Sequence, residues 1–242
     1  MARFFVEPWD MEGVSLSLTG DNAQHAKVLR LKPGEEVLIC DGRGRECVCA
    51  VEEVTPSVSL RILERRDSAS EARVRVSVYM AFPKADKLEH VIQKATELGA
   101  YEIVAFPSSR CITKLDNKSL TKKLERWQKI AASAAEQSGR GRIPQVVALE
   151  SFQEALSRAA QADKALMFYE NEQATTLRMA LEDGPFETVS LLTGPEGGLE
   201  VSEVEKARAA GLQICTLGKR ILRCETAPLC ALSAVMYAAG EF

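Results

Sequence analysis

The sequence has few of the residues from which metal centres and disulfide frameworks are built. Its 242 residues include two histidines, and its seven cysteines are odd in number and scattered. No C-x-x-C pair or Cys/His cluster with zinc spacing occurs, since the nearest pair, Cys47 and Cys49, alternates along an expected strand. We therefore expect reduced thiols, no bound metal and a cytoplasmic protein.

Long apolar runs and a strong charge excess are also missing. No run approaches the roughly 18 residues that span a bilayer, and the N-terminal stretch lacks the apolar core of a signal peptide. The net charge is −3, and a division at residue 72 does not separate a basic half from an acidic one. We expect no membrane segment, and any surface that binds nucleic acid must be local.

The sequence divides into two halves, 1–72 and 73–242, that differ in their pattern of expected strands and helices. The first half has short β-rich stretches between Gly and Pro turn signals (34–42, 46–54 and 57–65), which predict a small β-barrel. A polar stretch, 65–73, is expected to be a linker. The second half alternates strands and helices strictly, which predicts an α/β fold with a mostly parallel sheet covered on both faces.

Two helices of the second half have the start signals of a capping box. Asp86 is followed by Glu89, and Ser202 is followed by Glu205, each three residues later. Gly99 is expected to stop the first of these helices.

The stretch "LLTGPEGGLE" (191–200) places an acid among three glycines and a proline at the end of an expected strand. In parallel sheets, ligands bind at the carboxyl ends of strands. The stretch matches neither the dinucleotide fingerprint nor the P-loop, and Glu196 would repel a polyphosphate. The loop is either a Gly/Pro turn or one wall of a site for a ligand without phosphates.

A second special loop, "CTLGKRILRCETAP" (215–228), follows the next expected strand. Lys219, Arg220 and Arg223 lie within five residues, so the loop is either a solvated charged turn or a partner of the glycine loop. Arg223 and Glu225 could also serve as capping and ion-pairing residues of the last helix. Two such loops at adjacent strand ends would form one pocket.

Basic residues elsewhere are candidates for contacts with RNA phosphates. "AEQSGRGRIPQ" (135–145) carries Arg140 and Arg142 in a flexible stretch, and Lys84 lies in "FPKADK" (82–87) near a helix start. His25 lies near Arg30, and either RNA contact or a structural role is open for it.

Several stretches together closely resemble one family. They are "GPEGG" (194–198), "LGKRILRCETA" (217–227), "FPKADKLEHVIQKATELGA" (82–100) and "AAEQSGRGRIPQV" (134–146). The sequence is similar here to the RsmE family of 16S ribosomal RNA uridine-N3 methyltransferases, which belong to the SPOUT (α/β-knot) class. "RFFV" (3–6) and residues 25–44 resemble the family's PUA-like barrel. Cys224 is a departure, because family members often have Thr there.

The resemblance implies a fold, a cofactor and partners. The fold is a PUA-like β-barrel (1–72) followed by a SPOUT domain (73–242) whose last part forms a trefoil knot. The implied partners are a second copy of the chain and 16S rRNA or the small ribosomal subunit. The cofactor, S-adenosylmethionine, would lie bent between the two loops, in contact with Leu192, Thr193, Gly194, Gly197, Gly198, Leu217, Gly218, Ile221, Leu222 and Arg223.

The chemistry then assigns roles to three residues. Uridine N3 must lose a proton as it accepts the methyl group, so a cation should stabilise the anion that develops on the uracil oxygens. We expect Arg223 to do this, and Glu196 or Glu225 to orient the cofactor or assist proton loss. Glu225 could instead only pair with Arg223.

RNA is expected to lie along a set of basic residues from both halves, Arg3, His25, Arg30, Lys84, Arg140 and Arg142. Two other functions stay open at this stage: a SPOUT enzyme acting on another RNA or on a ribose 2′-OH, and a non-catalytic RNA-binding module.

Overall fold

The computed structural model describes residues 1–112 and 116–242, which fall into two compact units. The first unit comprises Met1–Glu71 together with Ala135–Ile143, and the second comprises Ala72–Ala134 together with Pro144–Phe242. The division drawn from the sequence gave residues 135–143 to the second half. Their contacts belong to the first unit.

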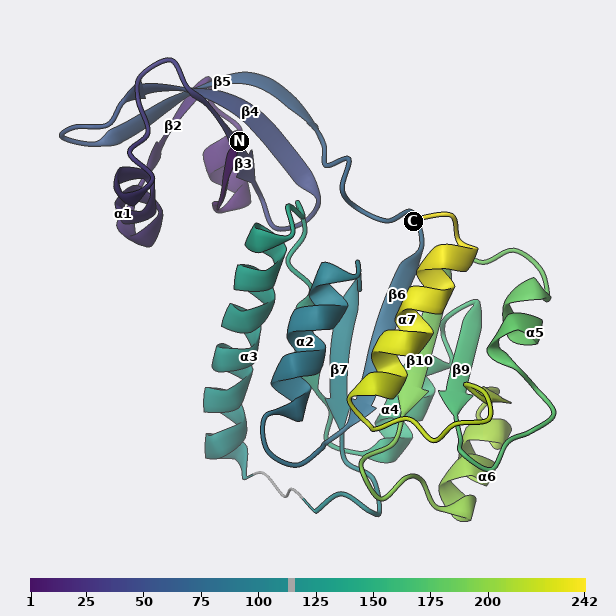
Figure 1. The fold of residues 1–242 in the computed structure, drawn as a ribbon. Helices are drawn as coiled ribbons and strands as arrows, with labels where there is room; N and C mark the ends of the chain where they lie inside the picture. The colour runs from purple at the N-terminus through teal and green to yellow at the C-terminus, as the bar shows by residue number, and fades with distance from the viewer. Residues whose placement is uncertain (113–115) are drawn as a thin grey trace. The chain divides into compact units, whose positions relative to one another are not determined.

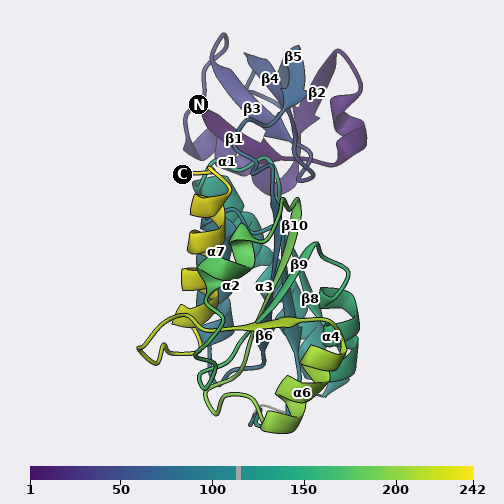
Figure 2. The same ribbon diagram turned by 90° about the vertical axis from the view of Figure 1, so that its right-hand side faces the viewer.

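The first unit is built on a curled five-stranded sheet with the order β1-β3-β4-β5-β2 (Figure 2). β1 runs parallel to β3, and the other neighbours are antiparallel. Apolar side chains that alternate along the strands, such as Val37, Ile39 and Leu60, are fully buried in its core. The elements are β1 (Ala2–Phe5), η1 (Pro8–Met11), β2 (Ser15–Leu18), α1 (Gly20–Val28), β3 (Glu36–Cys40), β4 (Arg45–Glu53) and β5 (Val58–Asp67).

The turn between β3 and β4 has the chemistry that the sequence suggested. Gly42 and Gly44 both have positive φ, 69° and 107°, a conformation that glycine adopts without a steric penalty. The Asp41 carboxylate accepts hydrogen bonds from the backbone N–H groups of Arg43 (2.7 Å) and Arg45 (3.0 Å). The antiparallel strands β3 and β4 therefore form a β-hairpin around this turn.

The second unit contains a six-stranded sheet with the order β11-β9-β10-β6-β7-β8, and every neighbouring pair is parallel (Figure 1). The strands are short apolar runs, as expected for a sheet that is covered on both faces. Their bounds are β6 (Arg75–Ala81), β7 (Glu102–Phe106), β8 (Gln145–Ala148), β9 (Lys164–Phe168), β10 (Thr188–Thr193) and β11 (Gln213–Cys215).

Helices cover both faces of this sheet. α2, α3 and α7 lie on one face, and α4 and α6 lie on the other (Figures 1 and 2). On α2 one apolar side is buried, at Leu88, Val91, Ile92 and Ala95. The helices are α2 (Lys87–Glu97), α3 (Asn117–Gln137), α4 (Phe152–Ala159), α5 (Leu177–Glu182), α6 (Val201–Ala209) and α7 (Thr226–Ala238).

The path of the chain after β11 brings the second special loop to the centre of the sheet. β11 is an edge strand, whereas α7 packs on the central strands β6 and β10 and against α2. Residues 216–225 must therefore run back across the carboxyl ends of β9 and β10. A small unit with a curled sheet followed by an all-parallel six-stranded sheet agrees with the fold that the resemblance implies.

Some local expectations were wrong. Asp86 is the N-cap of α2, but its side chain makes no capping hydrogen bond. The box at α6 lies two residues earlier than expected, because Glu203 accepts the N–H of Glu200 (2.9 Å). The expected linker 65–73 begins inside β5 and continues into the buried Ser68.

Among the described residues, no helix is long and apolar enough to cross a membrane.

Candidate functional site

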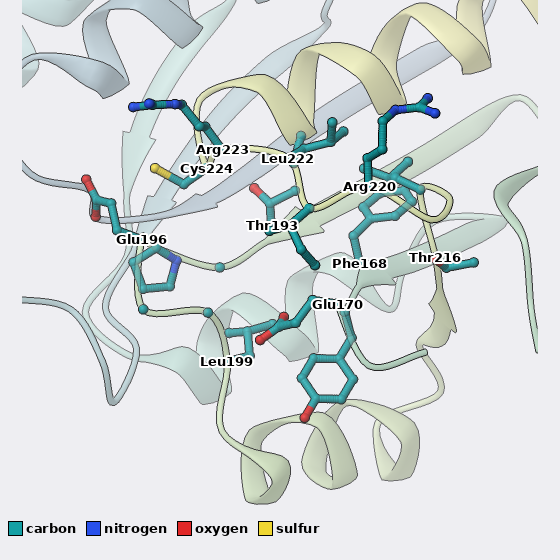
Figure 3. Close-up of a pocket in the computed structure, with 18 of the residues that line it drawn as sticks. Phe168, Glu170, Thr193, Glu196, Leu199, Thr216, Arg220, Leu222, Arg223 and Cys224 are labelled. Carbon is teal, nitrogen blue, oxygen red and sulfur yellow. The ribbon is translucent and has the colours of Figure 1, made fainter. Parts of the chain in front are cut away.

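A pocket of about 450 Å³ lies at the carboxyl ends of β9, β10 and β11 in the second unit. Its walls are the loop 193–199 after β10, the loop 216–224 after β11, and the residues 168–170 that end β9. Glu196, Cys224 and Arg223 lie together at one end, and Phe168, Thr216 and Arg220 lie toward the other (Figure 3). The two special loops of the sequence thus form one pocket, as the sequence suggested.

Glycines in the first loop allow a close approach that other residues would block. A Cβ on Gly194 would lie 3.0 Å from the Leu199 side chain and 3.1 Å from the backbone carbon of Gly198. Gly198 has a φ of +69°, and a Cβ there would lie 2.6 Å from the Glu170 carboxylate. The loop therefore presents bare backbone to the pocket, and Gly198 leaves room for Glu170.

The same loop is held from two sides by side chains. Glu196 accepts hydrogen bonds from the Lys84 backbone N–H (3.0 Å) and forms an ion pair with the Lys87 Nζ (3.1 Å). On the other side, the Arg110 guanidinium donates to the Gly197 carbonyl (2.9 Å). Glu196 therefore has protein partners, and it fixes the shape of the loop.

Lys87, the first residue of α2, connects both loops. Its Nζ lies 3.1 Å from Glu196 Oε1 and 3.2 Å from Glu225 Oε2, and it donates to Cys224 Sγ at 3.7 Å. Cys224 in turn donates to Glu225 Oε2 (3.2 Å). Glu225 thus pairs with Lys87 and Cys224, and among the described residues no ion pair joins it to Arg223.

The charges of this cluster are mutually stabilised. Burial would raise the pKa of Glu196, but hydrogen bonds from the backbone, including the Lys84 N–H, and from Lys87 bring it below its usual value. A backbone hydrogen bond, Cys224 and Lys87 lower the pKa of Glu225. The hydrogen bond to Glu196 raises the pKa of Lys87 above its ordinary value. Both carboxylates are therefore ionised and Lys87 is charged at neutral pH.

Cys224 has the properties of a structural thiol. Its side chain is buried, and burial together with the hydrogen bond to Glu225 raises its pKa to about 12. Nucleophilic cysteines need a thiolate near neutral pH. Arg223, directly before it, is exposed and lines the pocket, and its carbonyl accepts the N–H groups of Thr226 and Ala227 at the start of α7.

The expected cofactor residues mostly meet in this pocket. Leu192 is the exception, because its side chain is fully buried in the core beneath the pocket. The residues that do line the pocket are Thr193, Gly194, Gly197, Gly198, Leu217, Gly218, Ile221, Leu222 and Arg223.

The sequence did not indicate the contribution of β9. Phe168, Tyr169 and Glu170 line the pocket because β9 lies between β10 and β11 in the sheet. The strand "KALMFYE" ends in an aromatic pair and an acid, which was the available signal. It could be used only once the strand order was known.

Models of two protein families match the chain. A model described as an RNA methyltransferase domain matches residues 70–236, and one described as an RNA methyltransferase PUA domain matches residues 18–63. The first match contains every residue that lines the pocket, and the second falls within the first unit.

Similar proteins carry one shared name. The chain is 38% identical over 249 aligned residues to the ribosomal RNA small subunit methyltransferase E of Bacillus subtilis, covering 98% of this chain and 96% of the relative. A structure of the enzyme of that name from Neisseria gonorrhoeae, bound to S-adenosyl methionine, has a TM-score of 0.84 at 32% identity and covers 98% and 97% of the two chains. The chain belongs to the ribosomal RNA small subunit methyltransferase E family.

The chain is also similar to a solved structure from Legionella pneumophila, described as that of a putative methyltransferase with bound S-adenosylmethionine. It has a TM-score of 0.81 at 29% identity and covers 98% of this chain and 97% of its own. The resemblance inferred from the loop motifs is thereby confirmed at the level of the family.

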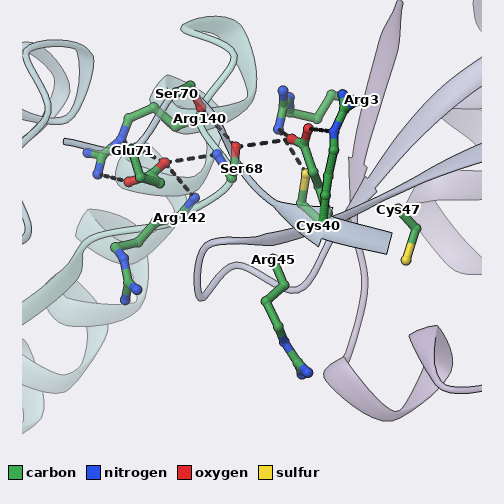
Figure 4. A network of polar contacts seen from close by, with 12 residues as sticks. Arg3, Cys40, Arg45, Cys47, Ser68, Ser70, Glu71, Arg140 and Arg142 are labelled. Atoms are coloured by element: carbon green, nitrogen blue, oxygen red, sulfur yellow. Dashed lines mark hydrogen bonds and ion pairs between the residues drawn. The ribbon is translucent and has the colours of Figure 1, made fainter. Parts of the chain in front are cut away.

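In the first unit, this family member carries a network of buried ionic contacts (Figure 4). Glu46 is 3% exposed and accepts hydrogen bonds from Arg3 (3.0 Å), Arg66 (2.9 Å) and Ser68 (3.0 Å). Burial alone would raise the pKa of Glu46, but these three donors bring it below its usual value. Arg3, a predicted RNA residue, thus serves a buried carboxylate, and its side chain is only 12% exposed.

Glu71 attaches the segment 139–142 to the first unit. Its carboxylate accepts from the Arg140 guanidinium (2.6 Å) and from the backbone N–H groups of Gly141 (2.9 Å) and Arg142 (3.0 Å). Arg140 is 4% exposed. The expectation of a flexible loop with two surface cations needs correction here, because Arg140 is a buried partner of Glu71.

The other predicted RNA residues remain at the surface or close to it. Arg142 is partly exposed and donates to the Arg43 carbonyl. His25 pairs with Glu136 (3.2 Å) and contacts the Phe4 ring edge-on. Arg30 in the first unit and Lys84 in the second are exposed. Across residues 1–112 and 116–242, no group of three or more His, Cys, Asp or Glu is arranged to hold a metal.

Proposed function

We propose that the pocket binds S-adenosylmethionine and that the protein transfers its methyl group to N3 of a uridine in 16S rRNA of the small ribosomal subunit. The observation that carries this proposal is the convergence of the loops 193–199 and 216–224 on one pocket at the carboxyl ends of parallel strands. A solved structure of the same family and a second structure of similar fold both contain bound S-adenosylmethionine.

The pocket fits such a ligand in size and in chemistry. Its volume of about 450 Å³ falls within the roughly 300–1,000 Å³ of small-molecule sites. Gly194 and Gly198 expose backbone where a Cβ would collide with neighbours. Glu170 and Glu196 in the lining disfavour a polyphosphate, whereas S-adenosylmethionine carries two cationic groups, its sulfonium and its ammonium, against a single carboxylate.

The cofactor would supply an electrophilic methyl group, and the protein's own residues would position and stabilise. Arg223 is exposed at the end of the pocket that also contains Glu196 and Cys224. Its guanidinium is suited to stabilise negative charge that develops on the uracil oxygens as N3 loses its proton.

The two carboxylates fit a structural role better than that of a strong base. Both have a pKa below the usual value, and both pair with Lys87. A weakly basic carboxylate is a poor proton acceptor at neutral pH. We therefore assign Glu196 and Glu225 to orienting the loops, and we assign the acceptance of the N3 proton to a water molecule.

Labelled methyl transfer to small ribosomal subunits that lack the modification tests this function. The expected product is N3-methyluridine, identified by the mass and retention of the released nucleoside. Primer extension gives an independent readout, because an N3 methyl blocks Watson–Crick pairing and a ribose 2′-O-methyl does not. A 2′-O-methyl product, or transfer only to another RNA, would contradict the proposal.

A non-catalytic RNA-binding module is the alternative from another class. It predicts no affinity for S-adenosylmethionine, which titration calorimetry measures directly. The pocket argues for an enzyme, since a module would not need a glycine loop held by Glu196 and Arg110 around an open cavity.

The resemblance also supports a homodimer packed through the second units. Sedimentation equilibrium should then give twice the chain mass of 26.5 kDa. A concentration-independent monomer would contradict this part of the proposal and leave the methyl-transfer reaction untouched.

A further inference from the structure

Three chain segments that are far apart in the sequence meet at one ammonium group. Lys87 begins α2, Glu196 lies in the loop after β10, and Glu225 lies directly before α7. The two carboxylates are 3.1 and 3.2 Å from the same nitrogen, and Cys224 Sγ is 3.7 Å from it. One side chain therefore joins both walls of the pocket to the helix behind them.

We propose that Lys87 is a positioning residue for methyl transfer: it ties the loop 194–198 to the start of α7 and so holds the pocket in the form that binds S-adenosylmethionine. The inference rests on the proposed function, because it names the cofactor whose binding depends on the tie.

The chemistry of the contact explains why a lysine suits this position. An ammonium group has three donors and no acceptor, so it can serve two carboxylates and a sulfur at once. Without the cation, two ionised carboxylates would face each other across the tie and repel. Removal of Lys87 should therefore release the two loops from each other, although Lys87 itself would not react.

The loop 194–198 has further contacts that do not involve Lys87, and they limit the effect of removing this lysine. Glu196 also accepts the Lys84 backbone N–H, and the Gly197 carbonyl accepts from Arg110. The loop 194–198 should thus remain folded in a Lys87 variant. Glu225 loses its ion-pair partner, so the relation between the two loops is what changes.

The pH dependence of cofactor binding is a readout that a purely structural role would not move. The pKa of Glu196 is lowered in the folded protein. A carboxylate with a lowered pKa stabilises the folded arrangement fully above its ordinary pKa. This stabilisation is lost as the pH falls through the lowered value. Affinity for S-adenosylmethionine should therefore fall on the acid side where Glu196 and Glu225 become protonated.

Other titratable groups around Lys87 must be separated from this effect. Glu196 faces it from the loop after β10, and Cys224 and Glu225 face it from the start of α7. On α2 itself, Asp86, Glu89 and His90 line the adjoining surface hollow with Lys87 and Glu225. Glu89 is paired with Arg126 of α3 at 2.6 Å. Measurement in a His90→Asn background removes the imidazole from the titration.

The experiment is calorimetry with S-adenosylmethionine on the full chain over a range of pH, using Lys87→Gln, Lys87→Arg and Glu225→Gln. At neutral pH, Lys87→Gln should bind about tenfold more weakly, the loss of two charge-assisted contacts, and Lys87→Arg should retain most of the affinity. The matched control is Lys94→Gln, which breaks another Lys–Glu pair on α2 (2.8 Å to Glu97) away from the pocket.

The acid limb, which is the fall of affinity for S-adenosylmethionine at low pH, should move in opposite directions in Lys87→Gln and Glu225→Gln. Lys87→Gln raises the pKa of both carboxylates, so affinity should begin to fall at a higher pH than in the wild type. Glu225→Gln leaves Lys87 entirely to Glu196 and should shift the fall to a lower pH. Thermal unfolding of each variant is recorded alongside, and a Lys87→Gln chain that does not fold leaves the decision to the sign of the Glu225→Gln shift.

Equal affinity and an equal acid limb in Lys87→Gln and in the wild type would overturn the inference and leave the proposed function intact. An unmoved or upward-shifted limb in Glu225→Gln would overturn it as well. A wild-type chain that binds no S-adenosylmethionine would instead contradict the proposed function itself, and the inference with it.

Discussion

At the scale of single residues, the site depends on glycines that leave room for neighbouring groups as well as on charged side chains. Gly198 combines a positive φ with a missing side chain next to Glu170. Glu196 is the acid within the glycine loop. Its carboxylate accepts the backbone N–H of Lys84 and forms an ion pair with Lys87. Glu170 is thus the lining acid that lies next to the glycine loop. The absence of a side chain at Gly198 leaves room for its carboxylate.

Substitution of Gly198 by alanine should weaken cofactor binding. The positive φ costs a residue with a Cβ about 1–2 kcal/mol, and the new methyl group would displace the Glu170 carboxylate, 2.6 Å from the ideal Cβ position. We expect at least a tenfold loss of affinity for S-adenosylmethionine by calorimetry. Gly211→Ala is the matched control, because Gly211 also has a positive φ (93°), but no atom of the described residues would lie within 4 Å of a Cβ there. Equal losses in both variants would show that strain alone matters.

Substitution of Arg223 by alanine should slow methyl transfer with little effect on cofactor affinity. A donor that stabilises developing anionic charge is worth about 100-fold or more in rate. Single-turnover methyl transfer to the small subunit measures the rate, and calorimetry measures the affinity. Lys219→Ala, in the same loop and also exposed, is the control. Unchanged transfer by the Arg223 variant would exclude the proposed role.

At the scale of elements, the sequence predicted type and order better than ends. The alternating strands and helices of the second unit were all found, because apolar periodicity reports which face of an element is buried. The capping contacts were misassigned, since the Asp86 side chain makes none at α2 and more than one acid could supply the contact at α6. At α6, Glu200 and Glu203 form the contact that Ser202 and Glu205 were expected to make.

The segment 139–142 is the clearest element that the sequence could not place. Its glycines and arginines indicate a flexible basic loop when read locally. The buried contact that fixes it comes from Glu71, about 70 residues earlier in the chain. A Cβ on Gly141 would lie 2.4 Å from that of Ser68, so this glycine serves close packing. No local pattern contains that information.

Removal of the Glu71 carboxylate should destabilise the first unit. Glu71→Ala leaves the guanidinium of Arg140, which is 4% exposed, without its ion-pair partner Glu71, and loss of one partner of a buried pair costs about 3–5 kcal/mol. Denaturant unfolding of the full chain measures the free energy. Glu64→Ala is the control, because its pair with Arg66 (3.7 Å) is exposed and should be worth about 1 kcal/mol or less. Similar losses in both variants would contradict the buried role of Glu71.

At the scale of the whole molecule, the order of the strands decides the site. The pocket forms because β9 lies between β10 and β11, and because the chain returns from the edge strand to α7 at the centre. Periodicity gives each element but not its neighbours, so Phe168 and Glu170 were missed. The resemblance to a known family supplied the topology, since unknotted connections are otherwise the rule.

The cations that we expect to contact RNA occur in both units, and two of them, Arg30 and Arg142, are in the first. Arg30 and Arg142 should each neutralise an RNA phosphate, whereas Arg140 should not, because it serves Glu71. The logarithm of the binding constant falls with the logarithm of salt concentration by about 0.7–0.9 per phosphate neutralised. Arg30→Ala with Arg142→Ala should therefore reduce this slope by about 1.4–1.8.

The measurement is RNA binding to a 16S fragment at several salt concentrations, by fluorescence anisotropy. Arg140→Ala is the informative comparison: we expect a lower unfolding free energy with a salt slope close to that of the wild type once the protein is folded. A slope that falls in Arg140→Ala but stays unchanged in the double variant would reverse the assignment. In that case the RNA would have to displace Glu71 from Arg140, and the segment 139–142 would rearrange on binding.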